Sequence, residues 1–235
     1  GSLIAVSVVV MAACGDDETE PAAGEDDSAV TTEPAAEPTP TDAAPGTTAG
    51  GSGGSAAECA AGKTVMEGML MIATGEPAFP PYVINDATPE DGQGFEAAVA
   101  MAVARELGFE GDGVGGIRTA FDAAIAPGPK DFDFNLQQYT ITDERKQVVD
   151  FSQGYYSAPQ AIFGLADSAA ADAKTLADLQ GLKIGVAAGT TSITYVEETI
   201  QPEQEPLILP DNAAAKVALE SNQIDAIVSD LPTAI

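Results

Sequence analysis

The sequence predicts an α/β protein with mainly parallel sheets, and three features lead to that prediction. Short apolar runs alternate with segments whose apolar residues recur at helical spacing, and this alternation is typical of parallel strands joined by helices. The alternation occurs as two successive series along the chain. In both series polar loops follow the carboxyl ends of strands, which is where ligands bind in open α/β sheets.

The first series contains three expected strands and two expected helices. The strands are the runs Met69–Thr74, Val114–Arg118 and Asp131–Gln137. A long helix is expected over Phe95–Leu107, because apolar residues recur at helical spacing and Gly108 follows as a stop signal. The apolar positions of this helix are Phe95, Val99, Val103 and Leu107. A short helix is expected over Thr119–Ala126.

Gly111–Gly116 formally matches the pattern G-x-G-x-x-G. A dinucleotide-binding fingerprint follows a strand and opens a helix, whereas this run follows the end of a helix. We therefore interpret it as a loop that enters the second strand.

A polar turn, Gln137–Thr140, follows the third strand, and a short helix is expected from Thr142 with acidic residues in its first turn. Arg145 projects from that turn. A guanidinium beside free backbone N–H groups and a hydroxyl suits a planar carboxylate. The alternative is an ordinary surface ion pair with Asp143 or Asp150, and local chemistry leaves both interpretations open.

The second series begins after an extended segment, Ser157–Leu165. A polar loop is expected at Ser168–Ala173 and a helical turn at Leu176–Leu179. Strands are expected at Lys183–Ala187, Leu207–Leu209 and Ile224–Ser229. Helices are expected at Ile193–Ile200 and from the capping residue Asp211 to Glu220.

Composition excludes several classes of function. The 235 residues include 37 acidic residues, nine basic residues and no histidine. Nucleic acids and anionic lipids are unsuitable partners, because both require basic patches. The absence of histidine removes the commonest metal ligand and the usual general base. We therefore expect no cofactor, no metal and no catalysis.

The amino terminus is expected to be an export signal. Residues 3–13 are apolar and immediately precede Cys14, and eleven such residues suit the core of a signal peptide better than a membrane span. Met11–Cys14 resembles a bacterial lipobox, which predicts a truncated lipoprotein signal over residues 1–14 and a lipid on Cys14. An ordinary secretory signal with a chance cysteine is the alternative.

Residues 15–62 are expected to form a disordered acidic linker. Residues 15–58 contain eleven acidic residues, no basic residue and one large aliphatic residue, Val30. Such a segment cannot bury enough apolar surface to offset its ordering entropy. If Cys14 carries a lipid, Cys59 is either a free thiol or pairs outside the sequence given.

From Gly68 onwards the chain resembles the extracellular solute-binding proteins of family 3, the amino-acid receptors of ABC importers. The matching motifs occur in the family's order and include G-Q-G-F-E-A-A-V-A, T-I-T-D-E-R, V-D-F-S-Q-G-Y-Y and A-L-E-S-N-Q-I-D-A-I-V-S-D. The resemblance implies a type II periplasmic-binding-protein-like fold. Its first lobe would span 63–157, a hinge crossing 158–165, and an incomplete second lobe 166–235, because the family's return strand and final helices would follow Ile235.

The resemblance also implies a ligand site between the lobes. Arg145 would clamp the α-carboxylate of an amino acid, and Asp230 would hold its α-ammonium. The remaining contacts would come from Phe79 over the ligand, Glu76 near its side chain, and Gln138, Thr140, Thr190 and Thr191 around the carboxylate. Simpler roles stay open for three of them: Phe79 as core, Asp230 as a helix cap and Thr190 as a helix cap.

The expected function is that of a monomeric, lipid-anchored receptor on the outer face of the cytoplasmic membrane. It would bind a neutral-polar or basic amino acid and deliver it to the permease subunits of an ABC importer. Two alternatives remain: the sensing domain of a membrane receptor, and a dehydratase, because the same fold also serves such an enzyme.

Overall fold

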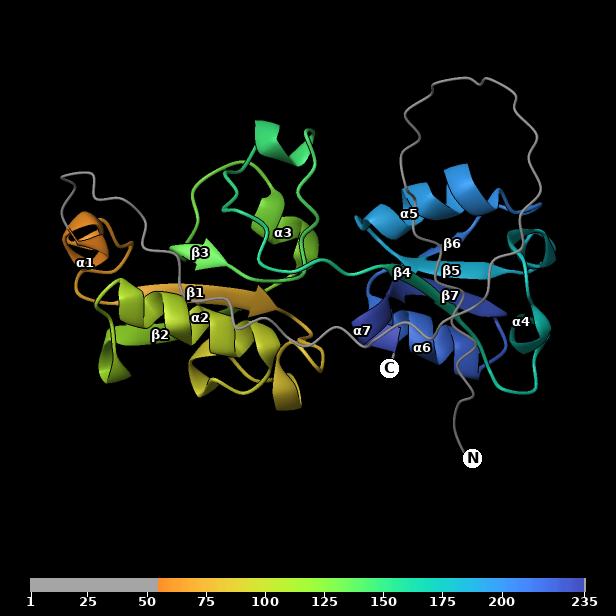
Figure 1. Ribbon diagram of the computed structural model, residues 1–235, viewed down its shortest axis with the longest axis horizontal. Helices are drawn as coiled ribbons and strands as arrows, with labels where there is room; N and C mark the ends of the chain where they lie inside the picture. Colours follow the sequence, from red (N-terminus) through yellow and green to blue (C-terminus); the bar gives the residue numbers. More distant parts are fainter. Residues whose placement is uncertain (1–54, 235) are drawn as a thin grey trace, which may run out of the picture. The chain divides into compact units, whose positions relative to one another are not determined.

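Two sheets with flanking helices make up the computed structural model, which describes residues 55–234 (Figure 1). The predictions about Cys14, the signal and residues 15–54 of the linker lie outside the described residues. The last part of the expected linker is ordered instead, because Ala56–Ala60 form helix α1. Ser55 and Glu58 form a reciprocal capping box there, which satisfies two of the helix's free N–H groups.

The first sheet has the order β2-β1-β3, and all three strands are parallel, as the alternation predicts. The strands are β1 (Leu70–Gly75), β2 (Val114–Thr119) and β3 (Phe134–Asn135). Strand β3 is much shorter than the expected run over Asp131–Gln137. The Asp133 carboxylate accepts hydrogen bonds from the backbone of Val65 and Met71, at 2.8 and 2.7 Å, which replaces part of the strand ladder.

Helix α2 (Phe95–Glu106) covers this sheet. Of the four large residues expected on its apolar face, Val99 and Leu107 pack against the core, but the fully buried apolar positions are alanines. Ala97, Ala100 and Ala104 are fully buried, whereas Phe95 and Val103 are 39% and 38% exposed. Small side chains allow the helix to approach the sheet closely. The alanines are therefore buried against the sheet, and the bulkier Phe95 and Val103 stay exposed. The short helix α3 spans Phe121–Ile125 and begins two residues later than expected.

Short turns complete the first series. The 3-10 turns in this part are Ile84–Asp86, Pro89–Asp91, Gly111–Gly113 and Arg145–Gln147. The G-x-G-x-x-G run enters β2 instead of opening a helix. This confirms that it is not a dinucleotide-binding loop.

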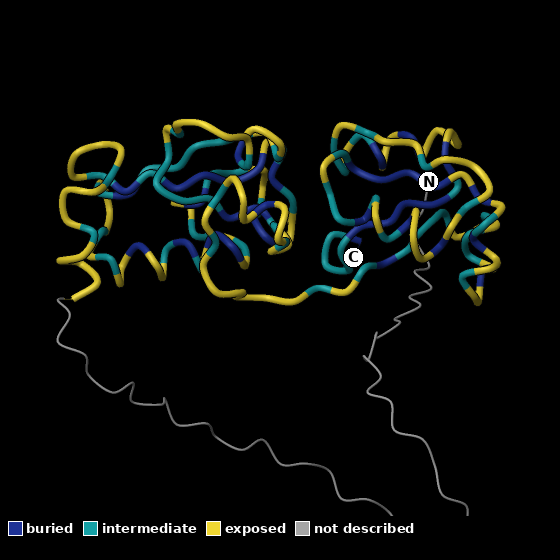
Figure 2. The backbone as a smooth tube through the Cα atoms, turned by 90° about the horizontal axis from the view of Figure 1, so that it is seen from above, coloured by how far each residue is buried: buried dark blue, intermediate teal, exposed yellow. Residues whose placement is uncertain are grey.

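The second sheet has the order β4-β7-β5-β6. Its strands are β4 (Gln160–Phe163), β5 (Ile184–Ala187), β6 (Leu207–Leu209) and β7 (Ala226–Asp230). Strand β4 is antiparallel to β7, and the other pairs are parallel. Because β4 is paired within this sheet, four of the eight residues of the expected hinge 158–165 belong to it. The segment that links the two sheets is 148–159, and its residues 152–157 are exposed (Figure 2).

The helices of the second series pack on both faces of the second sheet. They are α4 (Ala169–Asp172), α5 (Thr191–Tyr195), which continues as a π turn over Val196–Ile200, α6 (Asn212–Glu220) and α7 (Leu231–Ala234). A 3-10 turn spans Leu176–Leu179. Helix α4 lies where a polar loop was expected. Successive residues of β7 point to opposite faces of the sheet. Val228 packs with Val196 of the π turn, and Ile227 packs with Leu219 of α6.

The cap of α6 is as predicted, because the Asp211 side chain accepts a hydrogen bond from the Ala214 N–H at 2.7 Å. Residues 55–234 all fall within one compact unit. Among these residues, no helix has both the length and the apolar character needed to cross a membrane.

Candidate functional site

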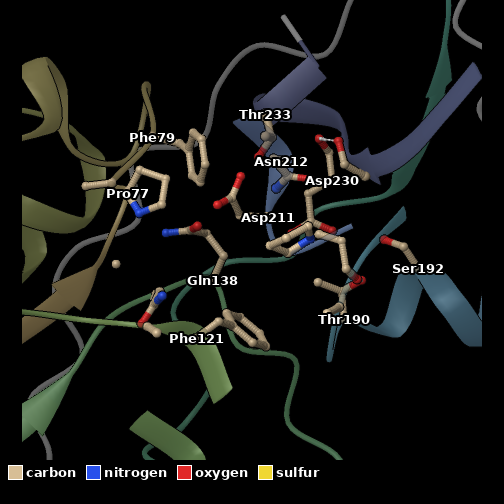
Figure 3. Close-up of a pocket in the computed structure, with 18 of the residues that line it drawn as sticks. Pro77, Phe79, Phe121, Gln138, Thr190, Ser192, Asp211, Asn212, Asp230 and Thr233 are labelled. Atoms are coloured by element: carbon tan, nitrogen blue, oxygen red, sulfur yellow. Dashed lines mark hydrogen bonds between the residues drawn. The ribbon is translucent and has the colours of Figure 1, made fainter. Parts of the chain in front are cut away.

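A cavity of about 240 Å³ is lined by the loops that follow the strands of both sheets. All eight residues expected to bind ligand line it: Glu76, Phe79, Gln138, Thr140, Arg145, Thr190, Thr191 and Asp230. The rule that ligands bind beyond the carboxyl ends of strands therefore locates the cavity correctly. Figure 3 shows the two aromatic rings of the site, Phe79 and Phe121, with Gln138 between them.

Arg145 is the only cationic side chain that lines the cavity, and it is 9% exposed. Its Nη1 donates to the Thr140 carbonyl and its Nη2 to the Gly189 carbonyl, both at 2.8 Å. The guanidinium carbon lies 5.5 and 5.6 Å from the ring centroids of Phe121 and Tyr139, within the range of cation–π attraction. Burial lowers the pKa of Arg145, but arginine keeps its charge in proteins.

Arg145 has no carboxylate partner among residues 55–234, so the surface ion-pair alternative is wrong for this arginine. Asp143 pairs instead with the exposed Lys146, at 2.9 Å. The only other ion pair in the described part of the chain joins Arg118 and Asp86. A buried guanidinium held by two neutral carbonyls is a site with an uncompensated positive charge.

The backbone around Arg145 differs from expectation. The helix expected from Thr142 is a single 3-10 turn, and the Thr142 hydroxyl accepts the Arg145 N–H at 3.2 Å. The N–H of Gln138 donates to the Glu96 carboxylate at 2.8 Å. The N–H groups of Gln138 and Arg145 are therefore not free to bind a ligand. The loops after the first sheet can contribute mainly side-chain groups, above all the Arg145 guanidinium.

Asp230 ends β7 and supplies a carboxylate to the same cavity. Its Oδ1 accepts from Gln160 Nε2 at 2.7 Å, and Gln160 Oε1 accepts from the Ser192 hydroxyl at 2.6 Å. Burial raises the pKa of Asp230, and the hydrogen bond from Gln160 opposes that rise. The carboxylate is fixed by an amide rather than by a cation, and none of the hydrogen bonds found for residues 55–234 joins it to the backbone of α7.

The loop before α5 contributes hydroxyl and N–H groups. The Thr190 hydroxyl donates to the Ala187 carbonyl at 2.7 Å and makes no side-chain cap bond to α5, so the simple capping role is wrong. The hydroxyls of Thr140 and Thr191 lie 3.3 Å apart. Thr191 is the first residue of α5, so its N–H has no partner within the helix.

Acidic and amide groups line the rest of the cavity. Glu76 is an exposed residue that lines the cavity, and Asp211 points into the cavity from the start of α6. The amide oxygen of Asn212 is buried without a hydrogen-bond partner. Three carboxylates thus share the cavity with one guanidinium. No cluster of residues suited to a metal ion occurs in the part of the chain that the structure describes.

Several cavity residues were missed by the sequence analysis. They are Phe121, Ser192, Asp211 and Asn212 on the wall, with Gln160 and Glu96 behind it. Phe121 and Asp211 each come two residues after a strand, so the strand-end rule could have identified both. Phe79 is half-buried and lines the cavity, so it is not simply a core residue.

The chain matches known proteins over most of the described residues. Residues 70–229 match the model for bacterial extracellular solute-binding proteins, family 3. An L-arginine-binding protein of Pseudomonas aeruginosa is 33% identical over 159 residues, which cover 66% of this chain and 58% of that protein. A probable histidine-binding protein of Campylobacter jejuni is 33% identical over 147 residues, which cover 60% and 53% of the two chains.

A solved structure shares the fold. The crystal structure of an ancestral amino-acid-binding protein, described as a precursor of cyclohexadienyl dehydratase, has a TM-score of 0.61 and 31% identity. The match covers 77% of each chain. Our chain spans little more than half the length of the two curated relatives. The extent of the family match nevertheless settles the classification: the chain belongs to the bacterial extracellular solute-binding proteins of family 3.

Proposed function

We propose that this protein is an extracytoplasmic receptor that binds a free amino acid in the cavity described above. One observation carries the proposal: the buried Arg145 and the half-buried Asp230 line one cavity, and neither is paired with an opposite charge among residues 55–234. A zwitterion supplies the carboxylate that the guanidinium lacks and the ammonium that Asp230 lacks. Each charge-assisted hydrogen bond of this kind contributes roughly 1.5–3 kcal/mol.

The charge of the cavity indicates the class of amino acid. After Asp230 has bound the α-ammonium, Glu76 and Asp211 remain, and Arg145 is the one cation. A second ligand carboxylate would meet these acidic groups, whereas a neutral-polar or cationic side chain would donate hydrogen bonds to them. A basic or neutral-polar amino acid is therefore the ligand, and the similarity to an L-arginine-binding protein supports this choice.

Phe79 and Phe121 provide apolar cover on the cavity wall, and the hydroxyls of Thr140 and Thr191 complete the carboxylate pocket. Thr190 lines the wall beside them, and its hydroxyl donates to the Ala187 carbonyl. The threonines come from loops after both sheets, so a bound ligand would contact both. A cavity of this volume is smaller than those typical of drug-sized ligands, which suits a single amino acid.

Delivery to an ABC importer and attachment to the membrane are further parts of the proposal. The signal-like residues 3–13, Cys14 and the acidic segment behind it support a lipid anchor with a linker. The test is fractionation of the full-length protein and of its Cys14→Ser variant. The variant should leave the membrane fraction; equal membrane retention of both proteins would overturn the anchor.

The binding proposal is tested by calorimetry of the full chain with a panel of L-amino acids. We expect saturable binding of a basic or neutral-polar amino acid and its loss in Arg145→Ala. Tight binding of glutamate alone would overturn the ligand class. Turnover of the ligand, instead of simple binding, would identify an enzyme.

A further inference from the structure

Glu96 is a buried carboxylate that the binding site described above does not include. It is the second residue of α2 and only 1% exposed. Its Oε1 accepts from the Gln138 backbone N–H at 2.8 Å and from the Tyr155 hydroxyl, and its Oε2 accepts from the Gln138 side-chain amide. One carboxylate thus receives three hydrogen bonds from two residues that lie far from it in sequence.

The first of these residues forms part of the cavity wall. Gln138 lines the cavity and has a backbone φ of 52°, in the left-handed region that residues other than glycine seldom adopt. Such a conformation costs on the order of 1–3 kcal/mol and persists only where its surroundings enforce it. Glu96 holds both the N–H and the side-chain amide of this residue, so it is the group that enforces the conformation.

The second residue belongs to the segment that links the two sheets. Tyr155 lies within the exposed stretch 152–157. Apart from its bond to Glu96, its ring packs against Phe95, with centroids 6.2 Å apart, and Tyr156 packs on the same ring at 5.1 Å. The start of α2 therefore anchors the linking segment through one hydrogen bond and two aromatic contacts.

A carboxylate is better suited to this position than an amide. All three partners are donors, and a carboxylate presents two acceptor oxygens, whereas glutamine would turn an NH₂ group toward some of them. The first three N–H groups of α2 already donate to the carbonyls of Pro81 and Tyr82, so the helix dipole alone adds a further preference for a negative charge there. Burial raises the pKa of Glu96, the bonds from Tyr155 and Gln138 lower it, and the charge of Asp230 raises it further.

We propose that Glu96 is a positioning residue that holds the Gln138 wall of the cavity in its left-handed conformation and couples this wall to the linking segment through Tyr155. Without Glu96, the wall and the segment lose their common anchor, and both become more mobile. The effect on ligand affinity rests on the function proposed above, whereas the effect on mobility does not.

Hydrogen exchange of the ligand-free full chain tests the mobility. In Glu96→Gln, exchange should increase in both 134–140 and 152–158 and stay unchanged in β5. The matched control is Glu106→Gln, the same substitution at an exposed position of the same helix, which should change neither segment. Wild-type exchange in Glu96→Gln would overturn the proposal.

Tyr155→Phe is the milder variant, needed in case Glu96→Gln fails to fold. It removes one hydroxyl and leaves both bonds from Gln138 in place. Coupling through Glu96 predicts faster exchange in 134–140 as well as in 152–158. An increase confined to 152–158 would show that Tyr155 is not coupled to the wall, and that part of the proposal would fail.

Calorimetry with L-arginine as the probe tests the consequence for binding. Glu96→Gln should weaken binding by about tenfold or more, the loss expected for a hydrogen bond to a charged group. In a Gln138→Gly background, where glycine adopts the left-handed conformation freely, Glu96→Gln should cost much less. Equal losses in the two backgrounds would overturn the positioning role. If the wild type binds no amino acid, the proposed function fails, while the exchange experiment still decides on Glu96.

Discussion

The guanidinium of Arg145 is buried against two carbonyls and two aromatic rings, and this environment explains why its replacement by lysine is not conservative. A planar fork can keep both carbonyl bonds and still present an N–H edge to a carboxylate, whereas an ammonium offers a single point charge. Burying a charge without an opposite charge is costly, so the free protein carries this cost and the ligand relieves it.

Arg145→Lys should therefore weaken amino-acid binding by about 100-fold, which corresponds to the loss of one or two charge-assisted hydrogen bonds. Calorimetry measures the effect. Lys146→Ala is the matched control, because this neighbouring cation is exposed and pairs with Asp143 outside the cavity. Similar losses in both variants would mean that the general field of the protein, rather than the Arg145 clamp, attracts the ligand.

The carboxyl group of Asp230 imposes a cost on the ligand-free protein. Its pKa is raised by burial, so the stability it contributes is complete below the pKa of the unfolded chain, about 3.9, and is lost as pH rises through its folded pKa. Asparagine keeps an oxygen for Gln160 but carries no charge. Aspartate at position 230 thus lowers the free energy of unfolding of the ligand-free protein but allows the protein to bind an ammonium group.

Asp230→Asn should therefore raise the melting temperature of the ligand-free protein at pH 7 while abolishing binding. A gain on the order of 1 kcal/mol corresponds to about 2–4 °C in a domain of this size. The difference from wild type should shrink as pH falls toward 4, because the wild-type carboxyl then becomes protonated. Calorimetric melting at both pH values gives the result; a difference that grows on acidification would contradict the sign of the pKa shift.

At the scale of single elements, the sequence predicts strands better than it predicts which face of a helix is buried. The bounds of β6 are as expected, and those of β1 and β2 differ by a residue, because apolar runs bounded by polar loops define a buried strand. For α2 only two of the four expected large residues, Val99 and Leu107, pack against the core, and the fully buried apolar positions are alanines. Helical spacing cannot show that a sheet will approach closely enough to exclude bulky side chains.

The site was predictable where a residue follows a strand or belongs to a family motif, as Arg145 and Asp230 do. Glu96 belongs to the motif G-Q-G-F-E-A-A-V-A, but the motif does not indicate what its carboxylate contacts, and Gln160 belongs to none of the motifs quoted above. Their importance comes from hydrogen bonds to residues 42 and 70 positions away. A pattern of neighbouring residues in the sequence cannot predict such contacts, because they form only in the tertiary structure.

The entry into α2 depends on Gly94, which has a φ of 107°. A Cβ atom there would lie 2.4 Å from the Tyr82 carbonyl oxygen, so alanine would be both strained and in collision with the backbone. Gly94→Ala should reduce the free energy of unfolding by about 2–4 kcal/mol. Gly128→Ala is the control: its φ is 120°, but no atom lies within 4 Å of the added Cβ, and strain alone should cost about 1–2 kcal/mol. Denaturant unfolding compares the two, and equal losses would contradict the steric account.

At the scale of the whole molecule, site residues from the loops after the first sheet contact site residues from the loops after the second sheet, even without a ligand. Arg145 donates to Gly189, and Thr140 lies against Thr191. A ligand that engages the same groups from both sides stabilises the arrangement in which these loops meet. Ligand binding should therefore appear as stability of the whole fold, and not only as a local effect.

The net charge of −28 complicates that measurement, because a cation such as arginine is attracted to any strongly acidic chain. A ligand at a hundredfold excess over its Kd adds about 2.7 kcal/mol to the free energy of unfolding, or about 5–11 °C in melting temperature. L-arginine should produce such a shift in wild type and none in Arg145→Ala.

Agmatine separates specific binding from bulk attraction, since it keeps the guanidinium and the amine of arginine but lacks the α-carboxylate. If Arg145 clamps that carboxylate, agmatine should cause little or no shift. Added salt screens exposed charges more than buried ones, so the L-arginine shift should also persist at high ionic strength. Equal shifts with agmatine and L-arginine, both lost in salt, would place the interaction on the acidic surface and remove Arg145 from the site.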